Sequence, residues 1–155
     1  MKRTLTTGLV VIISLIIDSS VFSIPKITKI PSNIAWTSID YKLSIGDKVY
    51  LVAVGEISPN GVLKCDPNGV PNHPELQAKL CILKTSNHAC LIGKIGIKGQ
   101  PFFVGSNLSI IANAEGELFL GINDNDLKNN SGEFSVTISI VKPKNNSTDS
   151  IGKSS

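Results

Sequence analysis

Residues 133–141, EFSVTISIV, carry the clearest structural signal in the chain. Apolar side chains stand at every second position from Phe134 to Ile140, and glutamate, serine and threonine fill the positions between them. A period of two puts the apolar side chains on one face of a β-strand and the polar ones on the other. This stretch therefore predicts a strand with one buried face.

Upstream of this strand, the sequence contains shorter runs of β-branched and apolar residues bounded by glycine, asparagine or proline. No stretch of three or more turns shows helical periodicity, and only a segment that begins with Pro74 and ends at residue 80 is expected to form a short helical turn. Many short strands separated by turns are typical of an all-β fold, and we predict a β-sandwich. The further predicted strands cover residues 48–55, 90–95, 108–114 and 117–122.

The beginning of the chain has the three-part layout of a secretory signal peptide. Lys2 and Arg3 precede an apolar run at residues 8–17, and Ser23 ends a segment with small residues one and three positions before the expected cleavage point. An uncleaved membrane anchor is the alternative, but about ten apolar residues are half of what a membrane span needs. We therefore expect residues 1–23 to be a signal peptide and the protein to be secreted or periplasmic.

The rest of the chain divides into three parts. Residues 24–35 contain two prolines and two lysines without periodicity, and we expect a segment that leads into the domain. Residues 36–141 contain all the predicted strands and form the predicted sandwich. Residues 142–155 are rich in lysine, asparagine and serine and are expected to be a disordered tail.

Length and composition argue against several classes of protein. The chain has 155 residues, which suits one domain, and its single long apolar run excludes a polytopic membrane protein. The net charge is only +3, and no basic cluster stands beside stacking aromatic residues, so nucleic-acid binding is not expected. The sequence holds two histidines and neither GxSxG nor HExxH, so we do not expect an enzyme.

Three cysteines, Cys65, Cys81 and Cys90, follow the predicted signal peptide. An oxidising compartment allows one disulfide, and Cys81 and Cys90 are the expected pair because they flank the same loop. The alternative is three buried, unreactive thiols. Zinc is not expected, since no CxxC motif is present.

Two predicted loops hold most of the polar chemistry. Residues 123–132 offer two carboxylates and several side-chain amides between two predicted strands, and Ca²⁺ prefers such oxygen ligands. The spacing is not that of an EF-hand, and an ordinary polar hairpin has the same composition. Residues 58–77 form an irregular segment of the length that is usual for functional or mobile loops, and His73 is its obvious polar side chain.

Three motifs, which follow one another along the chain in the family's order and at matching spacing, carry a resemblance to a known family. The most specific is Gly121-Ile122-Asn123-Asp124 followed by Asn129-Asn130-Ser131-Gly132-Glu133-Phe134-Ser135-Val136. The second combines Ala53-Val54-Gly55, Pro67-Asn68-Gly69 and His73-Pro74, and the third is Lys94-Ile95-Gly96. Over residues 36–140 the chain resembles the PA-IL-like galactophilic lectins, calcium-dependent sugar-binding β-sandwiches of bacteria. The resemblance implies a jelly-roll sandwich of the galactose-binding-domain type.

The resemblance also implies the ligands of a calcium ion. Asp124 matches a carboxylate ligand, and Asn129 and Asn130 match two side-chain amides. Pro59 matches a backbone carbonyl donor from the other loop, which any residue type can supply. The calcium loop is two residues shorter than in the galactophilic type, so the second carbonyl falls at Asp126, which can instead donate its carboxylate.

Glycan binding through this ion follows from the same resemblance. In the family, two vicinal sugar hydroxyls complete the calcium shell, and the residues matched by Asp124 and Asn129 also hydrogen-bond them. His73 matches a histidine that contacts the primary hydroxyl of galactose. Leu76 stands where the family has a glutamine and Gln77 follows one place later, so we expect a reduced preference for plain galactose. The candidate sugar-binding residues are His73, Gln77, Asp124, Asn125 and Asn129.

Two functions are therefore open. The first is a secreted calcium-dependent lectin, whose partners are glycans and in the first instance galactose-type sugars. The alternative is a calcium-stabilised structural or adhesion module that binds no sugar, because an ion that ties two loops together stabilises the fold by itself. A homo-oligomer is expected in the first case, since weak single sites gain strength by multivalency.

Overall fold

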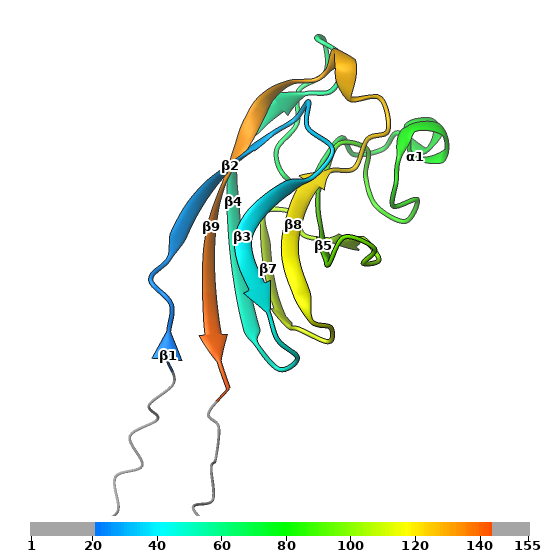
Figure 1. Cartoon of the computed structure of the whole chain (residues 1–155). Coiled ribbons are helices and arrows are strands. Elements are labelled where there is room, and N and C mark those ends of the chain that lie inside the picture. Colours follow the sequence, from blue (N-terminus) through cyan, green and yellow to red (C-terminus); the bar gives the residue numbers. More distant parts are fainter. Residues whose placement is uncertain (1–20, 144–155) are drawn as a thin grey trace, which may run out of the picture.

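The computed structural model describes residues 21–143, which form two antiparallel β-sheets packed face to face (Figure 1). The first sheet contains β1 (Val21–Phe22), β2 (Lys26–Pro31), β4 (Lys48–Ser58), β7 (Asn107–Ile111) and β9 (Ser131–Lys142). The second contains β3 (Thr37–Leu43), β5 (Leu91–Ile95), β6 (Phe102–Phe103) and β8 (Gly116–Ile122). Two short helical elements, α1 (Pro74–Leu80) and the 3₁₀ turn η1 (Leu127–Asn129), belong to the connections. The predicted β-sandwich is confirmed.

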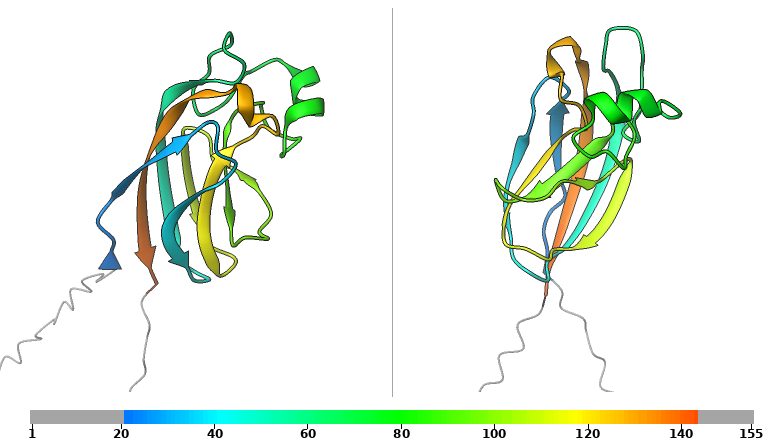
Figure 2. Two further views of the ribbon diagram at one scale, coloured as in Figure 1. Left: turned by 45° about the horizontal axis from the view of Figure 1, so that its top comes forward. Right: turned by 90° about the vertical axis from the view of Figure 1, so that its right-hand side faces the viewer.

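The strand order is β1–β9–β4–β7 in the first sheet, with β2 also paired to β9, and β3–β8–β5–β6 in the second. Figure 2 shows the two layers from two further directions. β9 has partners on both sides, β2 along residues 26–31 and β4 along its whole length. This central position explains why the period of two is clearest there.

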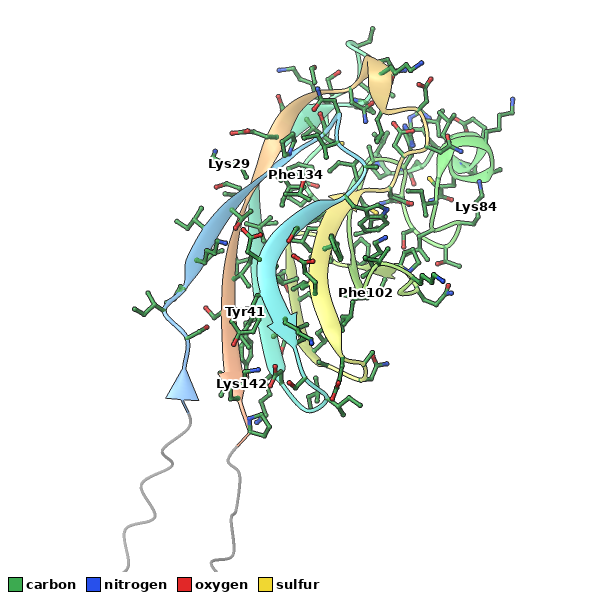
Figure 3. The ribbon with its side chains drawn as sticks, viewed as in Figure 1. Lys29, Tyr41, Lys84, Phe102, Phe134 and Lys142 are labelled. Atoms are coloured by element: carbon green, nitrogen blue, oxygen red, sulfur yellow. The ribbon has the colours of Figure 1, made fainter. Side chains whose placement is uncertain are left out.

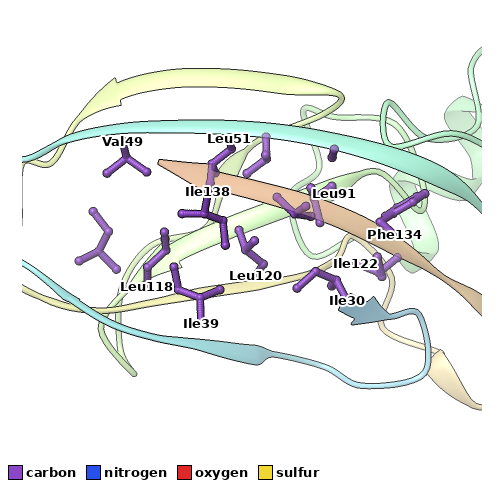
Figure 4. Close-up of a cluster of buried hydrophobic side chains, with 14 of the residues drawn as sticks. Ile30, Ile39, Val49, Leu51, Leu91, Leu118, Leu120, Ile122, Phe134 and Ile138 are labelled. Carbon is purple, nitrogen blue, oxygen red and sulfur yellow. The ribbon is translucent and has the colours of Figure 1, made fainter. Parts of the chain in front are cut away.

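The core lies between the two sheets (Figure 4). Phe134 is fully buried, and the backbone of Gly55 lies directly opposite it on β4. Gly55 has a φ of +114°, and a Cβ atom there would lie 3.0 Å from the carbonyl oxygen of Glu133. Only glycine adopts this conformation without strain, so Gly55 allows β4 to pass close to Phe134. The other core side chains include Ile30, Ile39, Val49, Leu51, Leu91, Leu118, Leu120, Ile122 and Ile138.

The predicted strands are all present, with ends that differ by at most three residues, and the predicted helical turn is α1 with Pro74 at its start. The segment expected to lead into the domain instead contains β2, which aligns with β9 from Lys26 to Pro31 and buries Ile30. Only one side chain of this edge strand is fully buried, so its sequence shows no alternation. Lys142, expected in the tail, is the last residue of β9.

Residues 1–20 and 144–155 lie outside the described residues, so most of the predicted signal peptide and tail do too. The last three residues of the predicted signal peptide lie against the end of β9, where the backbone N–H of Ser23 donates to the carbonyl of Ile140 at 2.9 Å. Among residues 21–143, no helix has the length and apolar character that a bilayer crossing requires.

Candidate functional site

The two polar loops meet where β4 ends and β9 begins, at the top of Figure 1 beside α1 and η1. The last paired residues of these strands are Ser58 and Ser131. Pro59 directly follows this last pair on one strand and Asn130 directly precedes it on the other. Two predicted calcium ligands, separated by about seventy positions in the sequence, are thus neighbours at one end of the sandwich.

The side-chain oxygen of Asn130 is the atom of this region that best fits a metal ligand. Its side chain is buried, and Nδ2 donates to the carbonyl of Ser32 at 3.0 Å. Its Oδ1 is also buried and accepts no hydrogen bond from any described residue. An unsatisfied buried oxygen costs roughly 1–3 kcal/mol, so native proteins usually supply a donor or a cation. The orientation of Asn130 therefore fits a metal ligand.

Asp124 is a second buried oxygen donor. Only 1% of its side chain is exposed, and Oδ1 accepts a hydrogen bond from the backbone N–H of Asp126 at 2.9 Å. The nearest basic atom is Nε2 of His88, 3.8 Å from Oδ2, which is too long for a hydrogen bond.

Burial lowers the pKa of His88; the charge of Asp124 opposes this effect and that of His73 adds to it. His88 is therefore neutral near pH 7 and does not balance the buried carboxylate of Asp124. A buried carboxylate without a cationic partner is costly, and a bound cation would remove that cost. The chemistry of the donors thus fits Ca²⁺, which binds carboxylate, amide and carbonyl oxygens.

The remaining predicted ligands lie on the η1 side of the loop. Asp126 precedes η1 and Asn129 is its last residue, and both side chains are exposed. Among residues 21–143, no three His, Cys, Asp or Glu side chains converge to hold a metal. The predicted set does not need such a cluster, because amides and a carbonyl supply most of its oxygens.

Asn123, which is not among the predicted ligands, anchors the start of the loop at residues 123–132. Its side chain is fully buried, its Oδ1 accepts the N–H of Leu83 at 2.7 Å, and its Nδ2 donates to the carbonyls of Leu83 and Asn87. These bonds hold residues 83–87 against the residue that precedes Asp124. The only sequence signal was an asparagine directly before the carboxylate.

α1 brings the predicted sugar-binding residues to the same end of the molecule. The backbone N–H of Asn125 donates to the carbonyl of Leu80 at 2.8 Å, and its Nδ2 donates to the carbonyl of Lys79 at 3.3 Å, which fixes the loop at residues 123–132 to the end of α1. Gln77 donates from Nε2 to Oδ1 of Asn87 at 3.2 Å. In Figure 3, Lys84 lies beside α1, where Nζ donates to the carbonyl of Ala78.

His73 stands at the N-terminal end of α1 and is partly exposed. Its Nδ1 lies 2.7 Å from Oε1 of Glu75, and this hydrogen bond lowers the pKa of the Glu75 carboxyl. Because the Glu75 carboxylate can only accept a hydrogen bond, a neutral His73 carries its proton on Nδ1 and donates it to Glu75, which leaves Nε2 as an acceptor. The ring is thus oriented and has one nitrogen free for an external hydroxyl.

The three cysteines are free and buried, so the expected bond between Cys81 and Cys90 is not formed. Burial raises the pKa of Cys65 and Cys90 to about 12 and that of Cys81 to about 11. The Cys81 Sγ lies 3.9 Å from Nδ1 of His88. The structure therefore has the alternative state, three buried thiols of low reactivity.

No protein-family model and no curated protein matches the chain. A solved structure described as the EclA N-terminal domain, a PllA-like lectin, is similar to it, with a TM-score of 0.59 and 23% sequence identity. The match covers 74% of this chain and 94% of that domain. At this level of identity, the likeness shows that the two share a β-sandwich fold.

Proposed function

We propose that the protein is an exported calcium-dependent lectin of the PA-IL-like type. The observation that carries this proposal is the buried Oδ1 of Asn130, which has no partner among the described residues; Asn130 directly precedes the last β4–β9 pair, and Pro59 directly follows it. The buried carboxylate of Asp124 beside a neutral His88 supports it, as does the fold shared with a PllA-like lectin.

The residues that would hold the ion come from both loops. Asp124 supplies the charged oxygen, Asn129 and Asn130 supply amide oxygens, and Pro59 supplies its carbonyl. Asp126 adds its carbonyl or its carboxylate. When bound, Ca²⁺ supplies open coordination positions for a pair of neighbouring sugar hydroxyls.

Residues around this ion contact the sugar and determine its specificity. Asp124 and Asn129 accept hydrogen bonds from the coordinated hydroxyls, and Asn125 borders them. His73 accepts a hydrogen bond at Nε2 from a peripheral hydroxyl, because Glu75 holds its other nitrogen. The hydrogen bond to Asn87 fixes the side chain of Gln77, which then presents a polar surface to the sugar, and Leu76 presents an apolar surface. Galactose-type sugars are therefore the starting class, with weaker preference for plain galactose.

A glycan array tests this proposal. The purified protein is applied in the presence of calcium and again in the presence of a chelator, and binding that requires calcium is expected. An Asp124→Asn variant is expected to bind no glycan either with calcium or with the chelator. If calcium stabilises the protein but no glycan is bound, the structural or adhesion module is correct; if calcium has no effect, the site assignment is wrong.

A further inference from the structure

The outer face of the first sheet exposes an apolar surface along β4. Val49, Leu51 and Ala53 point into the core, so the residues between them point outward. These outward side chains are 40–60% exposed although they are aromatic or aliphatic. Ile27 of β2 and Ile111 of β7 widen the surface on its two sides, and both are more than 60% exposed. We call the surface formed by Tyr50, Val52, Val54, Ile27 and Ile111 the β4 face.

The strand between β2 and β4 keeps this surface flat. β9 places short hydroxyl side chains in the rows occupied by the apolar residues of β4, so nothing large stands above the sheet there. A flat, partly apolar sheet face is suited to packing against another sheet at a distance of about 10 Å. The aligned residues of β9 are Ser135, Thr137 and Ser139.

The order of residues along β4 is complementary to itself. The outward side chains are Lys48, Tyr50, Val52, Val54 and Glu56, so a basic residue and an acidic residue stand four positions on either side of Val52. A two-fold axis through Val52 would place a second β4 antiparallel to the first. Each Lys48 would then face a Glu56, and each Tyr50 would face a Val54. We propose that the β4 face binds a second copy of this chain in this arrangement.

The charges at the two ends of β4 favour a second copy over an unrelated partner. Glu56 lies directly opposite Glu133 in the register, and two carboxylates in such a pair repel each other. Lys64 and Lys29 each neutralise one of them, at 2.8 and 2.9 Å, from the sides. Lys48 forms no ion pair with another described residue, so in the dimer the Glu56 of a second copy would give Lys48 an anionic partner that it lacks in the single chain.

The size of the surface is that of a small interface. Four strands from β2 to β7 span about 19 Å, and eight residue steps along β4 span about 27 Å, which gives roughly 500 Å² per copy. Stable interfaces bury about 800 Å² per partner, whereas weaker ones lie below about 600 Å². We therefore expect a reversible dimer that dissociates on dilution, with the interface of identical patches that a two-fold axis requires.

Sedimentation velocity of the purified protein over a range of concentrations tests this inference. The wild type is expected to shift from monomer to dimer within the micromolar range. Val52→Glu, which places two like charges on the axis, is expected to keep the protein monomeric throughout. Ile97→Glu makes the same change at an exposed position in the connection after β5 and is expected to leave the dimer intact.

Charge reversal tests the register. Lys48→Glu and Glu56→Lys are each expected to weaken the dimer by about tenfold, because each change creates two repelling pairs across the axis. The double variant restores opposite charges and is expected to recover the affinity, which a loss of folding would not do. Thermal melts check that each variant folds.

Three results would overturn the proposal. The first is a wild type that stays monomeric at every concentration, which would leave the terminal residues of the chain or another partner to cover the β4 face. The second is a dimer that Val52→Glu and Ile97→Glu weaken equally. The third is a double charge variant that is weaker than both single variants.

Discussion

Replacement of Asp124 by asparagine distinguishes two hypotheses for residues 123–132, a cation site and an ordinary polar hairpin. The side chain keeps its shape, and the new amide oxygen can still accept the N–H of Asp126, which now lies 2.9 Å from Oδ1. Only the negative charge is removed. Because the carboxylate is 1% exposed and His88 is neutral, that charge is costly in the absence of a cation.

The expected effect changes sign with calcium. In chelator, Asp124→Asn is expected to be as stable as the wild type or more stable. At a calcium concentration one hundred times the dissociation constant, ligand linkage stabilises the wild type by about 2.7 kcal/mol. For a domain of this size, that energy raises the melting temperature by roughly 10 °C. The variant has lost the charged ligand and is expected to show almost none of this rise.

Differential scanning calorimetry with calcium and with chelator measures both effects, and titration calorimetry measures calcium affinity directly. Asp66→Asn is the matched control, since Asp66 makes the same contact to the N–H two residues later, at 2.8 Å, but is exposed. An equal loss of stability by Asp124→Asn in both conditions would refute the reasoning, as would a wild type that calcium does not stabilise.

Four further outcomes are expected. His73→Ala should weaken glycan binding by about 1 kcal/mol, the worth of one hydrogen bond, while calcium affinity in titration calorimetry stays unchanged; loss of both would make the histidine structural. Mass spectrometry of protein from its native host should find a chain that begins after Ser23, whereas a mass that still includes residues 1–23, found in a membrane fraction, would establish the anchor. Burial raises the pKa of the three thiols to about 11 or 12, so they should resist alkylation at pH 8 until the protein unfolds, and rapid alkylation of the native protein would contradict this. The stability that the buried thiols confer should fall as the pH rises above about 9, because the thiols of the unfolded chain then lose their protons first. Lys142→Met removes the ammonium group that lies 2.7 Å from the fully buried carboxylate of Asp47. A urea titration should show a free energy of unfolding lower by about 2 kcal/mol, which is less than for a fully buried pair because Lys142 is partly exposed. An unchanged urea midpoint would show that Asp47 needs no cation.

The strands could be predicted where one face of a strand is buried and the other is not. β4 and β9 each have neighbours on both sides within the first sheet and cover the core with alternate residues, so the period of two is written in their sequences. β2 lies at the edge of the ladder with β9 and buries only Ile30 completely. A single buried side chain produces no period, so this strand could be found only through its partner.

The candidate site could be predicted for residues within one loop but not for contacts between loops. The aspartates and asparagines of residues 123–132 made this loop a candidate cation site on sequence alone. The role of Asn123 depends on Leu83, forty positions away, and the environment of Asp124 depends on His88, thirty-six positions away. Nothing in the local sequence indicates that a particular histidine is buried next to a particular carboxylate, since the fold alone joins them.

The two proposals together determine what kind of binding a dimer could perform. Pro59 and Asn130 lie beyond the end of β4 that carries Glu56, seven residue steps from Val52, which corresponds to about 24 Å. A two-fold axis at Val52 would send the second site in the opposite direction, so the two sites would lie roughly 50 Å apart and face away from each other. Two sites so arranged cannot both engage neighbouring glycans on one flat surface, because simultaneous binding requires a geometry that the linkage can span. Each can hold a glycan on a different surface. Such a dimer would therefore connect two glycan-bearing surfaces and would gain little affinity for either one alone.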